Sequence, residues 1–352
     1  MLTAGNMVIR QNIYKENGKI MKVTMNFSLS YDDMIRFSSA EELRDFYRNA
    51  GCDGLEVMPL EPDTRLLVLP DMAVGIHLCC PSDWMRMDRE QLLAHYRQNL
   101  ETARTLGAEY VVFHVTQVSP LESFTYVPEH TDEEVILATA ELVNELLSEQ
   151  EPSFWFLMEN LWWPGLNFRR PEMTYLLLES IHYQKKGLML DTGHFLHTNH
   201  KLRTQEEALL YLNQMLDEHE AYFHSARTGA DGEDFLAWIH GIHLQQSLTG
   251  AYVEDWLTRP HILSDDPMEQ MNQLFTHIFA IDKHRPFTAP GVRELVERIQ
   301  PEYVTLEYIT ESREQLAEYL SQGMAALKNE KIFVILPSFG LNICLLRASI
   351  TK

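Results

Sequence analysis

From Met21 onward, short runs of apolar and β-branched residues alternate with longer segments in which the apolar positions follow a helical period. Short apolar runs predict buried strands and the longer segments predict amphipathic helices, so the alternation predicts a chain of repeated βα units. The eight predicted strands read, in order, KVTMNFSLS, GLEVMPL, AVGIHLCC, YVVFHV, FWFLMEN, GLMLDTGHF, IHGIHLQQ and YVTLEYI.

The predicted helices lie between these strands. The clearest span Ser39–Ala50, Asp88–Leu106, Thr131–Gln150, Arg170–Ile181, Thr204–His219 and Ser312–Leu327. Several open with a hydroxyl residue followed by acids, as in SAEE, TDEE and TQEE, which caps the first free amides of a helix. Eight parallel strands with helices outside predict an α/β fold, a single-domain (β/α)8 TIM barrel. A doubly wound open sheet is the alternative, but no glycine-rich dinucleotide fingerprint supports it.

Two segments depart from the repeat. Only a proline-bearing loop, Glu61–Asp71, separates the second and third strands. After the seventh strand comes an insertion, Ser247–Ile281, before a short helix at Gly291–Ile299, and a loop of that length is more often functional than idle. We therefore divide the chain into an N-terminal extension (1–20), a barrel (21–330) and a C-terminal tail (331–352). The roles of both ends stay open: the apolar tail either packs on the barrel or mediates a contact.

Composition narrows the function. The 352 residues suit one barrel with insertions. With 29 Lys and Arg against 51 Asp and Glu, the net charge of −22 disfavours nucleic acids and anionic membranes and leaves a small-molecule substrate as the expected partner. The four cysteines form no CxxC pair, and no signal peptide or membrane span is visible, so we expect a soluble, cytoplasmic protein. Whether it forms a homo-oligomer stays open.

Metal-capable side chains stand at the carboxyl ends of most predicted strands, where TIM barrels build their active sites. They are His77, His114, Glu159, Asp191, His194, His243 and Glu307. A single strand-end histidine or acid is more often structural, but this many carboxylates in one place would repel one another without a cation. Mixed nitrogen and carboxylate ligands without thiolate suit Mn²⁺, Zn²⁺, Co²⁺ or Fe²⁺. The sequence thus predicts a divalent-metal site holding one to three ions.

Four motifs make the chain similar to a known superfamily. FLMEN, LMLDTGH, GIHLQQS and VTLEY follow in that order at barrel spacing. On these motifs the chain, over roughly Lys22–Leu327, resembles the xylose isomerase-like TIM-barrel superfamily, which includes sugar isomerases, epimerases and endonuclease IV. The resemblance implies that one divalent ion is held by four residues: Glu159, Asp191, His243 and Glu307.

The same resemblance implies further ligands or supporting residues. His77 and His114 occupy places where endonuclease IV-like relatives bind another metal, and His194 lies beside the main site. The motif DKHRPFTAPG places Asp282 and His284 as further candidates, although this chain carries the motif much farther beyond the seventh strand than relatives do. It also has Gln246 where relatives often carry an acid.

Three functions are compatible with this site. The first is a sugar or sugar-phosphate isomerase or epimerase, in which Glu159 and Glu307 transfer a proton next to a metal-bound carbonyl. The second is an endonuclease IV-like multi-metal phosphodiesterase acting on a small phosphodiester. The third is a barrel that binds a metal or sugar without turnover. We prefer the first at this point and keep the others as alternatives.

Several residues near the strand ends are candidates for substrate contact. Trp162 and Trp163 follow Glu159 directly and Trp84 follows the third strand, so each could stack on a sugar ring or equally pack as part of the rim. Gln246 completes the predicted substrate-binding set.

Overall fold

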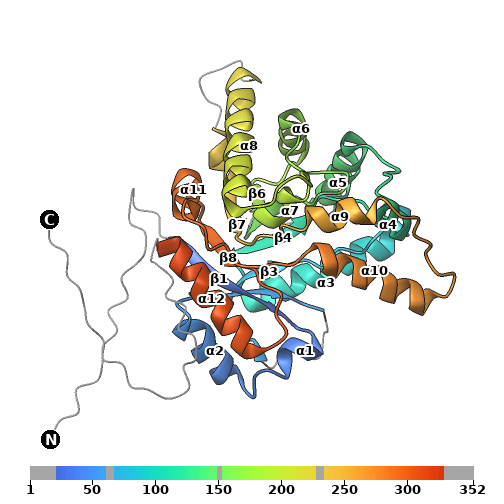
Figure 1. Ribbon diagram of the computed structural model, residues 1–352. Coiled ribbons are helices and arrows are strands. Elements are labelled where there is room, and N and C mark those ends of the chain that lie inside the picture. Colours follow the sequence, from blue (N-terminus) through green and yellow to red (C-terminus); the bar gives the residue numbers. More distant parts are fainter. Residues whose placement is uncertain (1–20, 61–66, 149–152, 227–233, 329–352) are drawn as a thin grey trace, which may run out of the picture.

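The computed structural model describes residues 21–60, 67–148, 153–226 and 234–328. Eight parallel strands close into one barrel, each hydrogen-bonded to the next and the eighth to the first (Figure 1). The strands are β1 Lys22–Ser28, β2 Gly54–Met58, β3 Ala73–His77, β4 Tyr110–His114, β5 Trp155–Glu159, β6 Lys186–Asp191, β7 Ile239–His243 and β8 Tyr303–Leu306. The predicted TIM barrel is confirmed.

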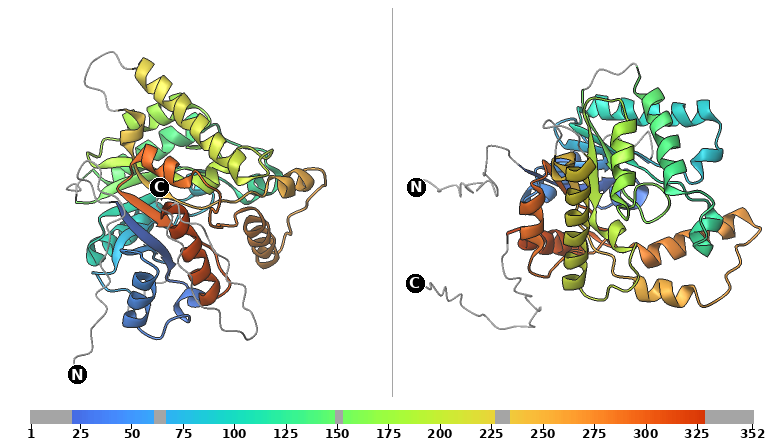
Figure 2. Two further views of the ribbon diagram at one scale, coloured as in Figure 1. Left: turned by 60° about the vertical axis from the view of Figure 1, so that its left-hand side comes forward. Right: turned by 90° about the horizontal axis from the view of Figure 1, so that it is seen from above.

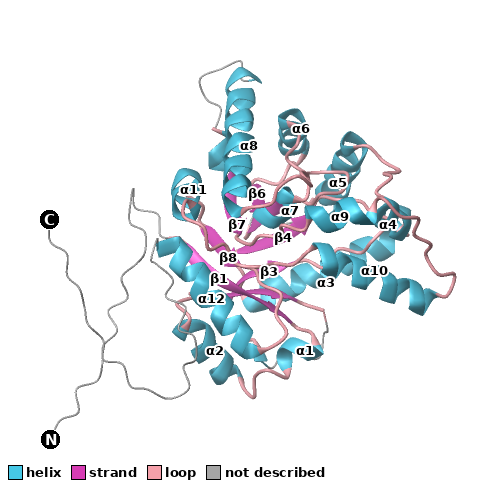
Figure 3. Ribbon diagram, in the orientation of Figure 1, coloured by secondary structure: helices cyan, strands magenta, loops and turns pink. Residues whose placement is uncertain are grey.

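Helices surround the barrel on its outside (Figure 3). In chain order they are α1 Tyr31–Met34, α2 Ala40–Asn49, η2 Trp84–Arg86, α3 Arg89–Leu106, α4 Pro120–Thr125, α5 Asp132–Leu146, α6 Pro171–Ser180, α7 Thr192–Leu196, α8 Gln205–Ala226, η3 Phe235–Trp238, α9 Gly250–Trp256, α10 Pro267–Ile281, α11 Val292–Ile299 and α12 Arg313–Lys328. Each of the clearest predicted helices is present, and the cap predicted at TDEE is a full capping box between Thr131 and Glu134.

The alternation of side chains along each strand decides what reaches the active end of the barrel. On β5, Leu157 belongs to a small apolar cluster inside the barrel, whereas Phe156 and Met158 belong to the larger core between strands and helices. Because successive side chains point to opposite faces, Glu159 falls on the inner side, at the carboxyl end of the strand. The inner cluster also contains Tyr110 and Val112 of β4, which precede His114 in the same way.

The sixth predicted strand is shorter than expected. We predicted that it runs through Phe195, but β6 ends at Asp191 and the next five residues form the helix α7. The carboxylate of Asp191 caps this helix by accepting the N–H of His194 at 2.6 Å. The same side chain thus ends the strand and starts the helix, and this turn brings His194 back over the barrel.

The insertion after β7, which the sequence analysis treated as a long loop, is largely helical. It forms two helices, α9 and α10, which lie beside α4 on one side of the barrel (Figures 1 and 2). Trp256 of α9 donates its indole N–H to the carbonyl of Phe124 at 2.9 Å, and the hydroxyl of Tyr126 lies 3.1 Å from Nε2 of His277 on α10. These contacts join the insertion to α4 and to Tyr126, the residue that follows it.

The predicted N-terminal extension and C-terminal tail lie outside the described residues. Among the helices in the described ranges, none combines the length and the apolar character needed to cross a membrane.

Candidate metal centre

Ten ionisable side chains meet at the carboxyl end of the barrel. Nine are residues singled out from the sequence, and the tenth is Glu56 of β2. They comprise five carboxylates, Glu56, Glu159, Asp191, Asp282 and Glu307, and five histidines, His77, His114, His194, His243 and His284. Within this group, four sets of three or four potential ligand atoms each lie within 4.8 Å of one another. The set that contains Glu56 consists otherwise of residues that belong to the other three sets.

The first set consists of His77, His114 and Glu159. One carboxylate oxygen, Oε2 of Glu159, lies 3.1 Å from Nε2 of each histidine. The two histidines come from the neighbouring strands β3 and β4, and their rings meet edge to face with centroids 4.7 Å apart. Adjacent strand ends thus present two nitrogens and one oxygen to the same point.

The second set contains the four residues that the family resemblance implied, Glu159, Asp191, His243 and Glu307. Nδ1 of His243 lies 3.1 Å from Oε1 of Glu159, 3.3 Å from Oε2 of Glu307 and 3.7 Å from Oδ2 of Asp191. Glu159 therefore belongs to both sets and offers one oxygen to each.

The third set consists of His194, Asp282 and His284. Oδ2 of Asp282 lies 2.9 Å from Nε2 of His284 and 3.4 Å from Nε2 of His194. The distance of the Asp-x-His motif from β7 along the chain does not separate it from the site, because α10 ends at Ile281 and delivers Asp282 directly. His284 adopts a left-handed backbone conformation, with φ at 43°, which is uncommon for a residue with a side chain.

Three of these histidines are held in the same way. Nδ1 of His77 donates to the carbonyl of Leu78 at 3.3 Å, that of His194 to the carbonyl of Asn160 at 3.0 Å, and that of His284 to the carbonyl of Glu307 at 3.2 Å. A carbonyl can only accept, so the hydrogen is on Nδ1, and Nε2 faces Glu159 in His77 and Asp282 in His194 and His284. Metal-binding histidines are usually oriented by such a bond from the second ring nitrogen.

Glu56 plays the corresponding role for His243, and the sequence analysis missed it. Its two oxygens lie 2.9 and 3.1 Å from Nε2 of His243, and its Oε2 also accepts the hydroxyls of Tyr110 at 2.7 Å and Thr305 at 2.8 Å. Glu56 also lies within ligand distance of His77, His243 and Glu307, but its contacts with these donors mark it as the residue that orients His243. The available signal was a single acid inside an otherwise apolar strand.

Asp191 is held by neighbours that were also not predicted. Gln245 donates to both carboxylate oxygens of Asp191, at 2.9 and 3.2 Å. The side-chain amide of Asn160 accepts from the backbone N–H of Asp191 and donates to its backbone carbonyl. A side chain at Gly193 would put its Cβ 1.9 Å from Oε1 of Gln245, so the glycine of the DTGH motif makes room for this amide.

The electrostatics of the group favour a bound cation. Burial raises the pKa of Asp191, and Glu307 adds to this against the opposing effect of His194, so that the pKa reaches about 7. Burial alone would lower the pKa of His243, but Glu307 and Glu56 hold it well above its ordinary value. A buried carboxylate that retains its proton, beside a histidine that acquires one, marks a place where positive charge is needed.

Two buried atoms provide a second test of this fit. Nε2 of His114 and Oε2 of Glu307 make no hydrogen bond among the described residues, although each lies within 3.3 Å of a possible partner. Buried polar atoms that converge without a hydrogen bond are costly unless another group satisfies them. One divalent cation in the first set would satisfy His114 and another in the second set would satisfy Glu307, and the nitrogen and carboxylate donors suit the ions expected from the sequence.

The four predicted substrate contacts lie in different settings. The Trp162 ring lies 5.3 Å from that of His194, and its buried N–H has no partner among the described residues. Trp163 is buried against Tyr126, and Trp84 is buried with its N–H donated to the carbonyl of Thr116 at 2.6 Å. Gln246 lines a cavity next to the third ligand set. Of the three tryptophans, Trp162 therefore has the clearest relation to the ligand atoms.

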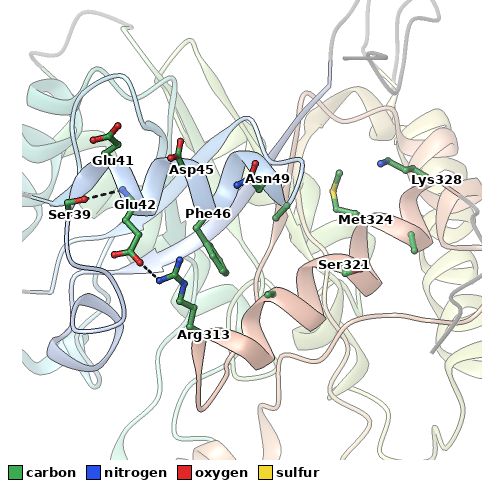
Figure 4. Close-up of a pocket in the computed structure, with 13 residues that line it drawn as sticks. Ser39, Glu41, Glu42, Asp45, Phe46, Asn49, Arg313, Ser321, Met324 and Lys328 are labelled. Atoms are coloured by element: carbon green, nitrogen blue, oxygen red, sulfur yellow. Dashed lines mark hydrogen bonds and ion pairs between the residues drawn. The ribbon is translucent and has the colours of Figure 1, made fainter. Parts of the chain in front are cut away.

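A larger cavity lies away from the metal ligands. It has a volume of about 860 Å³ and opens between α2 and α12, on the outside of the barrel (Figure 4). Its lining is mainly polar, and Arg313 and Glu42 form an ion pair across it. None of the ten converging residues lines this cavity, so its size does not make it the candidate active site.

Comparison with known proteins supports the barrel assignment. The family described as xylose isomerase-like TIM barrel matches residues 22–330. Among solved structures, AsfvAP:AG is 16% identical with a TM-score of 0.52, and covers 88% of this chain and 98% of that one. The probable 3-DHS dehydratase AsbF of Bacillus anthracis is 12% identical with a TM-score of 0.50, covering 87% and 99%.

A sugar phosphate isomerase/epimerase of Parabacteroides distasonis is 11% identical with a TM-score of 0.47, covering 89% of this chain and 96% of that one. No curated protein matches the chain. At 16% and 12% identity, the two structures with TM-scores of 0.52 and 0.50 support the fold alone, and the reaction has to be argued from the site.

Proposed function

Because the chain belongs to the xylose isomerase-like TIM-barrel family, we propose that it is a divalent-metal-dependent enzyme, and specifically a multi-metal hydrolase of a small phosphodiester. The observation that carries this proposal is the presence of three ligand sets that together use nine side chains, with Glu159 divided between two of them. A single-ion mechanism has no use for the set formed by His194, Asp282 and His284.

The chemistry follows from where charge develops in phosphodiester hydrolysis. Bound ions would lower the pKa of a water molecule and neutralise negative charge on the phosphoryl oxygens. The protein's own part is to hold the ligand atoms in a fixed arrangement. Glu159 keeps the first and second sets adjacent, and α7 holds His194 between Asp191 and Asp282, 3.6 and 3.4 Å away respectively.

The charge of the chain limits the substrate. A net charge of −22 opposes the approach of a long polyanion such as DNA, whereas a small diester carries little charge. Trp162, beside His194, offers an aromatic face for the organic part of such a substrate. These features favour a small molecule over a nucleic acid duplex.

The second candidate is the isomerase or epimerase that we preferred from the sequence, acting on a sugar or sugar phosphate. It is favoured by the placement of Glu159 and Glu307, whose carboxylates lie 3.1 and 3.3 Å from the same nitrogen of His243. Two carboxylates flanking one ion could act as acid and base on either side of a carbonyl. A non-catalytic metal-binding barrel is the remaining alternative.

The third ligand set separates these candidates experimentally. Protein loaded with Zn²⁺, Mn²⁺, Co²⁺ or Fe²⁺ would be assayed with bis(4-nitrophenyl) phosphate and with a panel of ketoses and sugar phosphates. We expect hydrolysis of the phosphodiester that is lost with chelator and in Asp282→Asn and His284→Gln. Epimerisation of a sugar that survives both substitutions would instead establish the second candidate, and no turnover of either kind would leave the binding-only barrel.

A further inference from the structure

A cavity of about 350 Å³ lies next to the third ligand set. Three of the side chains that line it are basic, Arg203, Lys283 and Arg285, and the others are polar and uncharged apart from one leucine. Within the described ranges of the chain, no acidic side chain lines it. The chain as a whole has 51 acidic residues against 29 basic ones, so this cavity reverses the charge balance of the protein.

Two of the three cations have no acidic partner in the part of the chain that the structure describes. Arg203 is paired with Glu254, which also pairs with Lys201, and Glu207 lies nearby because it caps the backbone N–H groups of Arg203 and Thr204. In contrast, neither Lys283 nor Arg285 has a carboxylate within 4.0 Å among the residues that the structure describes. These two side chains therefore present uncompensated positive charge to the cavity.

The cavity is built on the same segment as the metal ligands. Lys283 stands between Asp282 and His284, and the side chains of this segment alternate between the ligand set and the cavity. Arg285 is fixed by two backbone hydrogen bonds with Gln246, of 2.8 and 3.0 Å, and the residue before Gln246 is the amide that holds Asp191. A rigid backbone bridge thus joins the cations to the candidate centre.

We infer that this cavity is a subsite for a second phosphate group of the substrate, next to the phosphodiester that is cleaved. The inference rests on the proposed hydrolase function and narrows its substrate to a phosphodiester that also carries a phosphomonoester. A phosphate accepts hydrogen bonds from lysine and, in paired fashion, from arginine, and the surrounding amide and hydroxyl side chains can donate to its remaining oxygens. A sugar lacking phosphate would leave both cations unused.

Two esters test this subsite. One is 4-nitrophenyl thymidine 5′-phosphate, and the other is the same ester with an added phosphate on its 3′ oxygen. For the metal-loaded wild type we expect kcat/KM to be about tenfold or more higher for the phosphorylated ester, the size expected of a charge-assisted contact. Lys283→Gln combined with Arg285→Gln should remove this preference and leave the rate on the plain ester within about twofold.

The control makes the same charge change elsewhere. Lys185, just before β6 at the opposite end of the barrel, and Arg48 on α2 are replaced by glutamine together. This pair should leave both esters unaffected. Equal loss on both esters in the Lys283→Gln, Arg285→Gln variant, or a preference that the variant retains, would overturn the subsite.

Failure of the hydrolase proposal would be visible separately. If wild-type protein cleaves neither ester, the subsite is tested by calorimetric titration with thymidine 3′,5′-bisphosphate and thymidine 5′-monophosphate. If wild type binds the bisphosphate more tightly than the monophosphate, and the Lys283→Gln, Arg285→Gln variant does not, the anion site is supported even though the hydrolase proposal has failed. Equal binding of the two nucleotides to wild type would overturn it.

Discussion

Replacing Glu56 by glutamine tests how the centre is organised. The carboxylate lies within 3.1 Å of Nε2 of His243 and can only accept hydrogen bonds, so it keeps the histidine's hydrogen on Nε2 and leaves Nδ1 facing Glu159 and Glu307. A glutamine amide can turn its N–H toward Nε2, which moves the hydrogen to Nδ1. If it turns its oxygen instead, the tautomer survives but the negative charge is lost.

The size of the effect follows from the contact that is lost. A buried hydrogen bond to a charged group is worth about 1.5–3 kcal/mol, which corresponds to a factor of about 10–150 in binding. Loss of a residue that orients a metal-binding histidine typically costs about 10–100-fold in metal affinity. We therefore expect Glu56→Gln to weaken the binding of the ion at Asp191, His243 and Glu307 by about 10–100-fold.

The assay is a competition titration of the metal-free protein with Zn²⁺ against a chromophoric chelator. Glu141→Gln, a solvent-exposed acid of α5, makes the same charge change and should bind as wild type does. Circular dichroism and the thermal midpoint of the metal-free variants show whether the fold is retained. If folded Glu56→Gln binds zinc with wild-type affinity and stoichiometry, Glu56 does not orient His243 for metal binding.

Four other substitutions give distinct outcomes. Glu159→Gln should remove about two ions per chain and His284→Gln about one, because Glu159 belongs to two ligand sets and His284 to one. Elemental analysis of the metal-loaded variants measures these losses, and equal losses in the two variants would show that the sets are not separate. Gly193→Ala should displace Gln245 and weaken metal binding by about tenfold, whereas unchanged zinc affinity would mean that Gln245 does not support Asp191. Burial lowers the pKa of His219 to about 4, while its Nδ1 donates to the Met215 carbonyl and its Nε2 accepts from Thr174. As the pH falls from about 6.5 to about 4, this histidine is protonated in the unfolded chain but stays neutral in the folded one. The free energy of unfolding therefore falls by about 1.4 kcal/mol for each pH unit across that window. In urea unfolding, the stability advantage of wild type over His219→Gln should shrink as pH falls from 6.5 to 4; a pH-independent difference would contradict this.

Much of the fold was predictable because each barrel strand has a simple pattern. In FWFLMEN the apolar run predicts a buried strand, and the alternation that puts Leu157 inside the barrel also puts Glu159 there. Strand ends meet on one face of a barrel, so the residues at those ends could be grouped before any coordinates were known. The family resemblance carried by the four motifs then indicated the four residues of the second ligand set.

Other features depend on contacts between distant segments. Glu56 lies in the middle of β2, and only the closed barrel brings it against His243 and Thr305. The division of Glu159 between two ligand sets is a property of distances and cannot be read from residue order. In the insertion a usable signal was missed, because Asp266 caps α10 and Pro267 occupies its first turn, as helix starts commonly do.

The number of ions per chain tests the central claim most directly. The protein would be loaded with Zn²⁺ or Mn²⁺, passed over a chelating resin to remove loosely bound metal, and measured by elemental analysis against protein concentration. Three ligand sets predict close to three ions per chain, falling to about two in Asp282→Asn. A count of one in wild type that Asp282→Asn leaves unchanged would contradict the multi-metal centre.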